Sequence, residues 1–93
     1  MDLMEQCRIW HNNKEDDKVV ETLKKVPGKD LTQDLSFIYA RSCNSLAAND
    51  LFDERTYAKA RSELHRALDL LLPLKGALSK DFEYNYETGF SYL

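Results

Sequence analysis

The sequence predicts an all-α fold, and three observations support that prediction. Glycine and proline are scarce, with three and two among 93 residues, so the chain has little of the usual turn-forming material. Apolar residues recur every three or four positions in four successive stretches, which is the period of an amphipathic helix. Residues 82–87 alternate with period two, but a lone strand would have no partner, so we expect a helix there too.

The first two expected helices lie before residue 27. The first has three apolar residues on one face: Leu3, Cys7 and Trp10. Asn13 is expected to cap the second helix, with Asp16 in its first turn, where an acidic side chain complements the helix dipole. The second helix has an aliphatic stripe: Val19, Val20, Leu23 and Val26. Pro27 and Gly28 end it, because proline cannot continue a helix.

The third expected helix opens at Asp30, with Gln33 three positions later as a loose capping box. Its buried face has five residues at helical spacing: Leu35, Ile38, Tyr39, Cys43 and Leu46. A polar loop at Asn49–Asp53 separates it from a fourth helix that runs from about Arg55 to Leu72. The fourth helix has its own stripe: Tyr57, Ala60, Leu64, Ala67, Leu68 and Leu71.

A fifth helix is expected beyond Pro73, capped by Ser79 and running from Asp81 to Leu93. It holds five of the ten aromatic residues: Phe82, Tyr84, Tyr86, Phe90 and Tyr92. One face of a helix holds about half of such a set, so the remainder leaves an apolar patch of the kind that marks interfaces. The segment Phe82–Leu93 is therefore a candidate for homodimerisation.

The chain also repeats itself. A shift of 33 residues superimposes Cys7 on Ala40, and a further shift of 49 superimposes Ala40 on Gly89. The second helix of each pair repeats at a shift of 41, with Leu23 falling on Leu64. The unequal shifts correspond to eight-residue insertions in the connections. Small residues thus recur where the two helices of a pair must approach each other.

This pattern resembles the tetratricopeptide repeat, a helix–turn–helix unit of about 34 residues. The clearest match is the run Tyr39-Ala40-Arg41 on a first helix, followed on the second helix by three small or apolar residues: Ala60, Leu64 and Ala67. The resemblance covers nearly the whole chain. It divides one domain, residues 1–93, into units of about 1–29 and 30–78 and a partial unit at 79–93.

The resemblance implies antiparallel helix pairs stacked as a short superhelix of about five helices. The sequence departs from the family pattern in the eight-residue insertions. It also departs where a large residue is expected four positions before the small one, since Ser36 and Asn85 stand there. An unrelated bundle of four or five helices, which would give similar stripes, is the alternative.

Composition excludes several classes of protein. A net charge of −3 speaks against a generally basic nucleic-acid binder. The longest apolar run, Leu70–Leu72, is too short for a membrane span. The first residues lack the basic and apolar regions of a signal peptide. Two cysteines do not make a disulfide framework, so we expect a reduced, cytoplasmic chain.

Residues for catalysis or metal binding are few. Cys7 and His11 are four apart and could share a helix face, but a metal site would need two further ligands. Cys43 and His65 stand on other expected helices without supporting spacing. No glycine-rich phosphate loop and no nucleophile elbow occur. We therefore expect a non-enzyme without metal or cofactor, with a thiol- or metal-dependent enzyme as the remote alternative.

The resemblance also implies a concave groove lined by the first helix of each unit. Side chains that follow the small packing positions, or lie one turn away, point into it: Met4, Arg8, His11, Phe37, Arg41, Asn44, Tyr86, Phe90 and Leu93. Arginine binds carboxylates through paired hydrogen bonds, asparagine can bond a peptide backbone, and aromatic residues supply contact area.

We therefore expect a scaffold that binds a protein or peptide carrying an acidic group. Two alternatives stay open. Arg8 and Arg41 could instead pair with acids of the domain itself, such as Glu5 or Asp34. The chain could also be a structural self-association module that uses its terminal aromatic helix.

Overall fold

The computed structural model describes residues 2–51, 54–74, 85 and 87–89. They form four α-helices: α1 (Leu3–Asn12), α2 (Asp16–Leu23), α3 (Gln33–Asp50) and α4 (Tyr57–Leu71). Three short 3₁₀ helices accompany them: η1 (Gly28–Asp30), η2 (Glu54–Thr56) and η3 (Leu72–Leu74). Residues 85 and 87–89 are also helical. No strand occurs among the described residues, so the all-α prediction is confirmed for this part of the chain.

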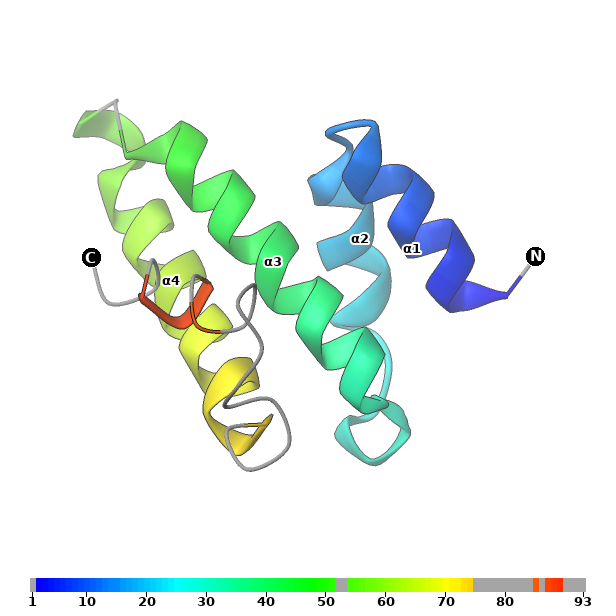
Figure 1. Cartoon of the computed structure of the whole chain (residues 1–93). Helices are drawn as coiled ribbons and strands as arrows, with labels where there is room; N and C mark the ends of the chain where they lie inside the picture. The colour runs from blue at the N-terminus through cyan, green and yellow to red at the C-terminus, as the bar shows by residue number, and fades with distance from the viewer. Residues whose placement is uncertain (1, 52–53, 75–84, 86, 90–93) are drawn as a thin grey trace.

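The helices follow one another as two antiparallel pairs, α1 with α2 and α3 with α4 (Figure 1). The long helix α3 lies in the middle and packs against α1, α2 and α4. The short helical stretch near residue 88, red in Figure 1, lies beside α3, to which Asn44 joins it by hydrogen bonds to Glu87. No helix in the described ranges has the length and apolar character that crossing a membrane requires.

The predicted start of α2 is wrong. Asn13 is the C-cap of α1, and its N–H donates to the carbonyl of Ile9 at 3.0 Å. Lys14 follows with φ of 62°, a left-handed conformation that reverses the chain. The second helix begins at Asp16 after Glu15, whose side chain forms no capping hydrogen bond. The turn is therefore made by the backbone of Lys14 and not by an asparagine cap.

The predicted capping box of α3 is also wrong. The N-cap is Thr32, whose side-chain oxygen accepts a hydrogen bond from the N–H of Leu35 at 3.1 Å. Asp30 belongs to η1 instead, because its N–H donates to the carbonyl of Pro27 at 2.8 Å. An N-terminal cap on α1 that the sequence analysis missed is Asp2, which accepts from the N–H of Glu5 at 2.8 Å.

The polar run expected as a loop at Asn49–Asp53 is helical in its first part. Helix α3 continues through Asp50, and the N–H of Leu51 still donates to the carbonyl of Ala47 at 2.9 Å. Asn49 is exposed, so its side chain can turn to solvent and need not compete for backbone hydrogen bonds. Helix α4 begins at Tyr57, two residues after the predicted start.

The core forms where small residues let the helices approach. Four of the predicted small packing positions are 0% exposed: Cys7, Ala40, Ala60 and Ala67. One apolar cluster joins all four helices: Cys7, Val19, Leu23, Leu35, Ile38, Tyr39, Ala40, Cys43, Ala67 and Leu71. A smaller cluster joins α3 to α4: Ala47, Ala60 and Leu64. The stripes predicted from spacing therefore supply the observed core.

Three packing predictions are wrong. Tyr57 is 51% exposed and Leu3 is 36% exposed, because each stands in the first turn of its helix, beyond the reach of the neighbouring helices. Gly89 is exposed, and in the described part of the chain no atom of another element lies within 4 Å of the place a Cβ would occupy. It therefore makes no close contact with the described helices, unlike Cys7 and Ala40. Most of the aromatic segment Phe82–Leu93 lies outside the described residues.

Candidate functional site

A cavity of about 330 Å³ lies between α1 and α3, and we call it the α1–α3 cavity. The described residues that line it all belong to these two helices: Met4, Arg8, His11, Asn12, Asp34, Phe37, Ile38 and Arg41. Two arginines with a histidine and an aromatic residue are thus brought to one place, as the sequence analysis expected. The sequence did not predict three further lining residues: Asn12, Asp34 and Ile38. The four-residue spacing of Asp34 and Ile38 on α3 was a signal that they share a face of that helix.

The small residues at the helix contact explain why the two arginines meet. Cys7 and Ala40 are both fully buried in the same apolar cluster, so α1 and α3 approach closely there. Arg8 and Arg41 each follow one of these residues, and both line the cavity. The repeat of 33 residues therefore corresponds to neighbouring positions in space.

Arg41 is held from two sides. Its guanidinium carbon lies 5.8 Å from the centroid of the Phe37 ring, within the range of a cation–π contact. Its Nε lies 3.8 Å from Oε2 of Glu87, an ion-pair distance longer than a direct hydrogen bond. The alternative in which an acid of the same chain pairs with an arginine is thus correct for Arg41, although the acid is Glu87.

Arg8 differs from Arg41. It is exposed, and among the described residues no acid forms an ion pair with it. The expected alternative pairing with Glu5 is therefore wrong; Glu5 instead takes part in the capping turn of Asp2 through its N–H. Asp34 is the one acidic residue among the described residues that line the cavity, and Glu87 offsets the charge of Arg41 from beside it.

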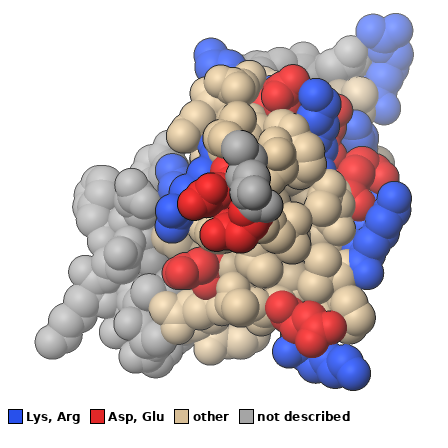
Figure 2. Space-filling view, turned by 90° about the vertical axis from the view of Figure 1, so that its right-hand side faces the viewer, with Lys and Arg blue, Asp and Glu red and all other residues tan. Residues whose placement is uncertain are grey.

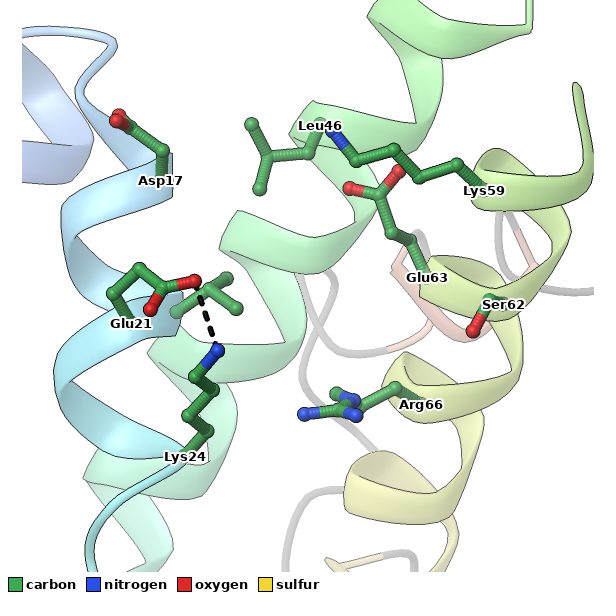
Figure 3. A pocket seen from close by; sticks show the side chains of 9 residues that line it. Asp17, Glu21, Lys24, Leu46, Lys59, Ser62, Glu63 and Arg66 are labelled. Atoms are coloured by element: carbon green, nitrogen blue, oxygen red, sulfur yellow. Dashed lines mark hydrogen bonds and ion pairs between the residues drawn. The ribbon is translucent and has the colours of Figure 1, made fainter. Parts of the chain in front are cut away.

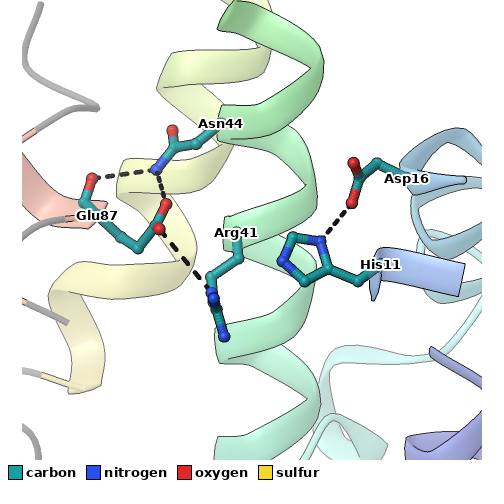
Figure 4. Close-up of polar contacts among 5 residues, drawn as sticks. All are labelled: His11, Asp16, Arg41, Asn44 and Glu87. Atoms are coloured by element: carbon teal, nitrogen blue, oxygen red, sulfur yellow. Dashed lines mark hydrogen bonds and ion pairs between the residues drawn. The ribbon is translucent and has the colours of Figure 1, made fainter. Parts of the chain in front are cut away.

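His11 ties α1 to α2. Its Nδ1 lies 2.5 Å from Oδ1 of Asp16, which is 7% exposed (Figure 4). This contact leaves Nε2 as the ring nitrogen available to a ligand in the α1–α3 cavity. Cys7, four residues earlier, is buried in the apolar core, and burial raises the pKa of its thiol. Within the described ranges, no three metal-ligating side chains of His, Cys, Asp or Glu come together.

Asn44 does not line the α1–α3 cavity. It is 3% exposed, and its Nδ2 donates to both the backbone carbonyl and Oε1 of Glu87, each at 3.0 Å. The sequence analysis expected Asn44 to hold a peptide backbone, and its observed acceptor is a backbone carbonyl of its own chain. Tyr86 and Phe90, the other predicted groove residues, lie outside the described residues.

A second cavity, of about 260 Å³, is bounded by α2, α3 and α4, and we call it the α2–α4 cavity (Figure 3). Its walls are rich in charge: Asp17, Val20, Glu21, Lys24, Leu46, Lys59, Ser62, Glu63 and Arg66. Lys24 Nζ lies 2.9 Å from Glu21 Oε1, so these two charges compensate each other. Arg66 donates from Nη1 to the uncharged hydroxyl of Tyr39 at 2.7 Å.

Glu63 is the unusual group of the α2–α4 cavity. Both carboxylate oxygens are withdrawn from solvent, and burial together with the neighbouring Asp50 carboxylate raises its pKa to about 8. Lys59 opposes this shift and lies 3.8 Å from Asp50. The sequence analysis missed Glu63, although its position three residues after Ala60 and four before Ala67 places it on the inner face of α4.

The face of the molecule formed by α1 and its surroundings carries both signs of charge. Figure 2 shows Lys and Arg side chains among Asp and Glu side chains there, without a broad basic patch. A nucleic-acid interface would require such a patch or stripe, and this face does not provide one.

No protein-family model, curated protein or solved structure matches this chain.

Proposed function

We propose that the chain is a non-catalytic scaffold of tetratricopeptide-like helix pairs that binds an acidic protein or peptide segment in the α1–α3 cavity. The observation that carries the proposal is the pair of arginines, Arg8 and Arg41. They stand at equivalent positions of two successive first helices and line one cavity. Two arginines on separate surfaces of the molecule would not indicate a shared binding site.

The chemistry of the lining favours a carboxylate. A guanidinium group offers paired donors that match the two oxygens of a carboxylate. Phe37 supplies apolar surface beside Arg41, which suits the aliphatic part of a glutamate side chain. A volume of about 330 Å³ is near the lower end for ligand sites. It suits one or two residues of a peptide better than a large cofactor.

The packing of small residues in the core also supports the scaffold hypothesis. Cys7 and Ala40 are the small residues at which α1 meets α3, and Ala60 and Ala67 play the same part on α4. These residues hold the helices close and leave the neighbouring side chains to face outward. Recognition then depends on side chains carried by rigid helices, which lose little freedom when a ligand binds.

The proposal can be tested with a fluorescein-labelled hexapeptide that contains two adjacent glutamates, which we call the glutamate peptide. Fluorescence anisotropy should show binding to the wild-type chain. Arg8→Ala should weaken it by about 1.5–3 kcal/mol, the value of a hydrogen bond to a charged group. Binding should also weaken as salt is raised, because exposed charges are screened.

The matched control is Arg61→Ala. Arg61 is an exposed arginine of α4 that lines neither cavity, so its removal should leave the affinity unchanged. Far-UV circular dichroism should give the same helical signal for both variants. Equal loss of affinity in both variants, or no binding by the wild-type chain, would contradict the proposal.

A further inference from the structure

Glu87 makes the same kind of contacts that the proposed function requires of a ligand. Asn44 Nδ2 donates to its backbone carbonyl and to Oε1, each at 3.0 Å. Arg41 Nε lies 3.8 Å from the other oxygen, Oε2. Figure 4 shows Arg41 on α3 with Glu87 on one side and His11 on the other. One glutamate is thus recognised through its side chain and its main chain together.

The burial of these groups makes the position selective. Asn44 is 3% exposed, and the Glu87 side chain is 13% exposed. A buried amide group that lacks a hydrogen-bond acceptor costs free energy. Loss of Glu87 would therefore be unfavourable, because it removes the two acceptors that Glu87 gives to Asn44 Nδ2. If Glu87 leaves, a replacement must bring both a carbonyl and a carboxylate. Another acidic residue of a peptide chain supplies both groups.

Arg41 links this position to the α1–α3 cavity. The same side chain that pairs with Glu87 also lines the cavity with Arg8. Glu87 therefore offsets one of the two positive charges that would attract an acidic partner. Displacing Glu87 would remove this offset from Arg41 and free the Nδ2 donor of Asn44 at the same time.

We propose that Asn44 and Arg41 form a binding position for one glutamate of a peptide segment, and that Glu87 is its resident occupant, which an external acidic segment must displace. This inference rests on the proposed function and specifies both the partner residue and the control of access. The apparent affinity of a site that is open for only a fraction of the time is reduced by that fraction.

The first experiment is binding of the glutamate peptide to Glu87→Gln. The variant keeps the shape of the side chain but removes the charge that holds Arg41. If Glu87 blocks the position about nine tenths of the time, the variant should bind about tenfold more tightly than wild type. Glu54→Gln is the matched control, since Glu54 is exposed and lines neither cavity, and it should bind as wild type does.

A second measurement uses the wild-type chain, so it does not depend on the folding of a variant. In nuclear magnetic resonance spectra, the side-chain amide signals of Asn44 and the backbone signal of Glu87 should move together as the glutamate peptide is added. Peptide binding in which these signals stay fixed overturns the inference. Equal or weaker binding by Glu87→Gln overturns it as well, while the proposed function stands. Absence of binding by the wild-type chain overturns the proposed function and this inference with it.

Discussion

The α1–α3 cavity has a volume of about 330 Å³ and the α2–α4 cavity about 260 Å³. The two are similar in size, and both use residues of α3. In the α2–α4 cavity three cationic side chains face three acidic ones, and Lys24 is paired with Glu21. In the α1–α3 cavity Arg8 and Arg41 accompany one acidic lining residue, Asp34, and Arg41 is also paired with Glu87. Each cation of the α2–α4 cavity has a polar partner, whereas Arg8 has none among the described residues. The pairing of the cations, and not the volume, therefore distinguishes the two cavities.

The prediction of greatest magnitude concerns the contact between α1 and α3, which a bulkier residue should disrupt. Ala40→Leu places a larger side chain where Cys7 and Ala40 are both fully buried. Overpacking of this kind should lower the free energy of unfolding by about 1–3 kcal/mol, as measured by urea denaturation. Ala58→Leu, on an exposed position of α4, is the control and should change stability little. Equal stability of the two variants would show that Ala40 is not a close packing position.

The second prediction concerns the ionisation of Glu63, which adds a negative charge to the α2–α4 cavity as pH rises. The pKa of Glu63 is raised from 4.5 to about 8. Between these two pH values the folded chain keeps the carboxyl proton of Glu63, whereas the unfolded chain loses it. The contribution of Glu63 to stability is therefore fully present below about pH 4.5 and is lost as pH rises through about 8. Glu63→Gln cannot lose a proton, and its advantage over wild type should grow across this window.

The expected advantage of Glu63→Gln is about 1–2 kcal/mol at pH 8.5, because solvent screening reduces the full effect for a partly exposed group. Thermal melts of both proteins between pH 5 and 9 measure it. Glu54→Gln, which changes an exposed glutamate, should run parallel to wild type. A difference between Glu63→Gln and wild type that does not vary with pH would refute the shifted pKa.

The last prediction, of least magnitude, tests whether the position of a cation matters for binding. Lys24→Ala removes one cation from the α2–α4 cavity, as Arg8→Ala does from the α1–α3 cavity. Lys24 is 43% exposed and its partner Glu21 is 63% exposed, so their ion pair contributes about 0.2–1 kcal/mol at most. The variant should bind the glutamate peptide as wild type does. A loss of affinity as large as that of Arg8→Ala would show that total charge, not its placement, governs binding.

Apolar spacing was sufficient to predict the helices but not their ends. The stripes on α2, α3 and α4 and the small packing residues follow directly from a period of 3.6 residues, and they form the observed core. Caps depend on local backbone geometry, and several residues of suitable type stand near each boundary. Asp30 and Thr32 are both good N-caps by residue type. The 3₁₀ turn after Pro27 takes Asp30 and leaves Thr32 as the cap.

The candidate site was predictable where it depends on the repeat and not where it depends on distant contacts. Arg8 and Arg41 are brought together by the packing of Cys7 on α1 and Ala40 on α3 in one cluster, a relation visible as the spacing of 33 residues. The engagement of Asn44 by Glu87 joins residues 43 positions apart, and no periodicity connects them. Such contacts depend on which residues distant in the sequence come together in the folded chain.

The two cysteines give the molecule a chemical reporter of its own opening. Cys7 and Cys43 are free and buried, and burial raises the pKa of Cys43 to about 12. Only the thiolate reacts with disulfide or maleimide reagents, so both buried thiols are unreactive while the helices stay packed. Modification of Cys7 then reports separation of α1 from its neighbours, and modification of Cys43 reports separation of α3. The rates of labelling under native conditions would compare these two openings without any change to the sequence.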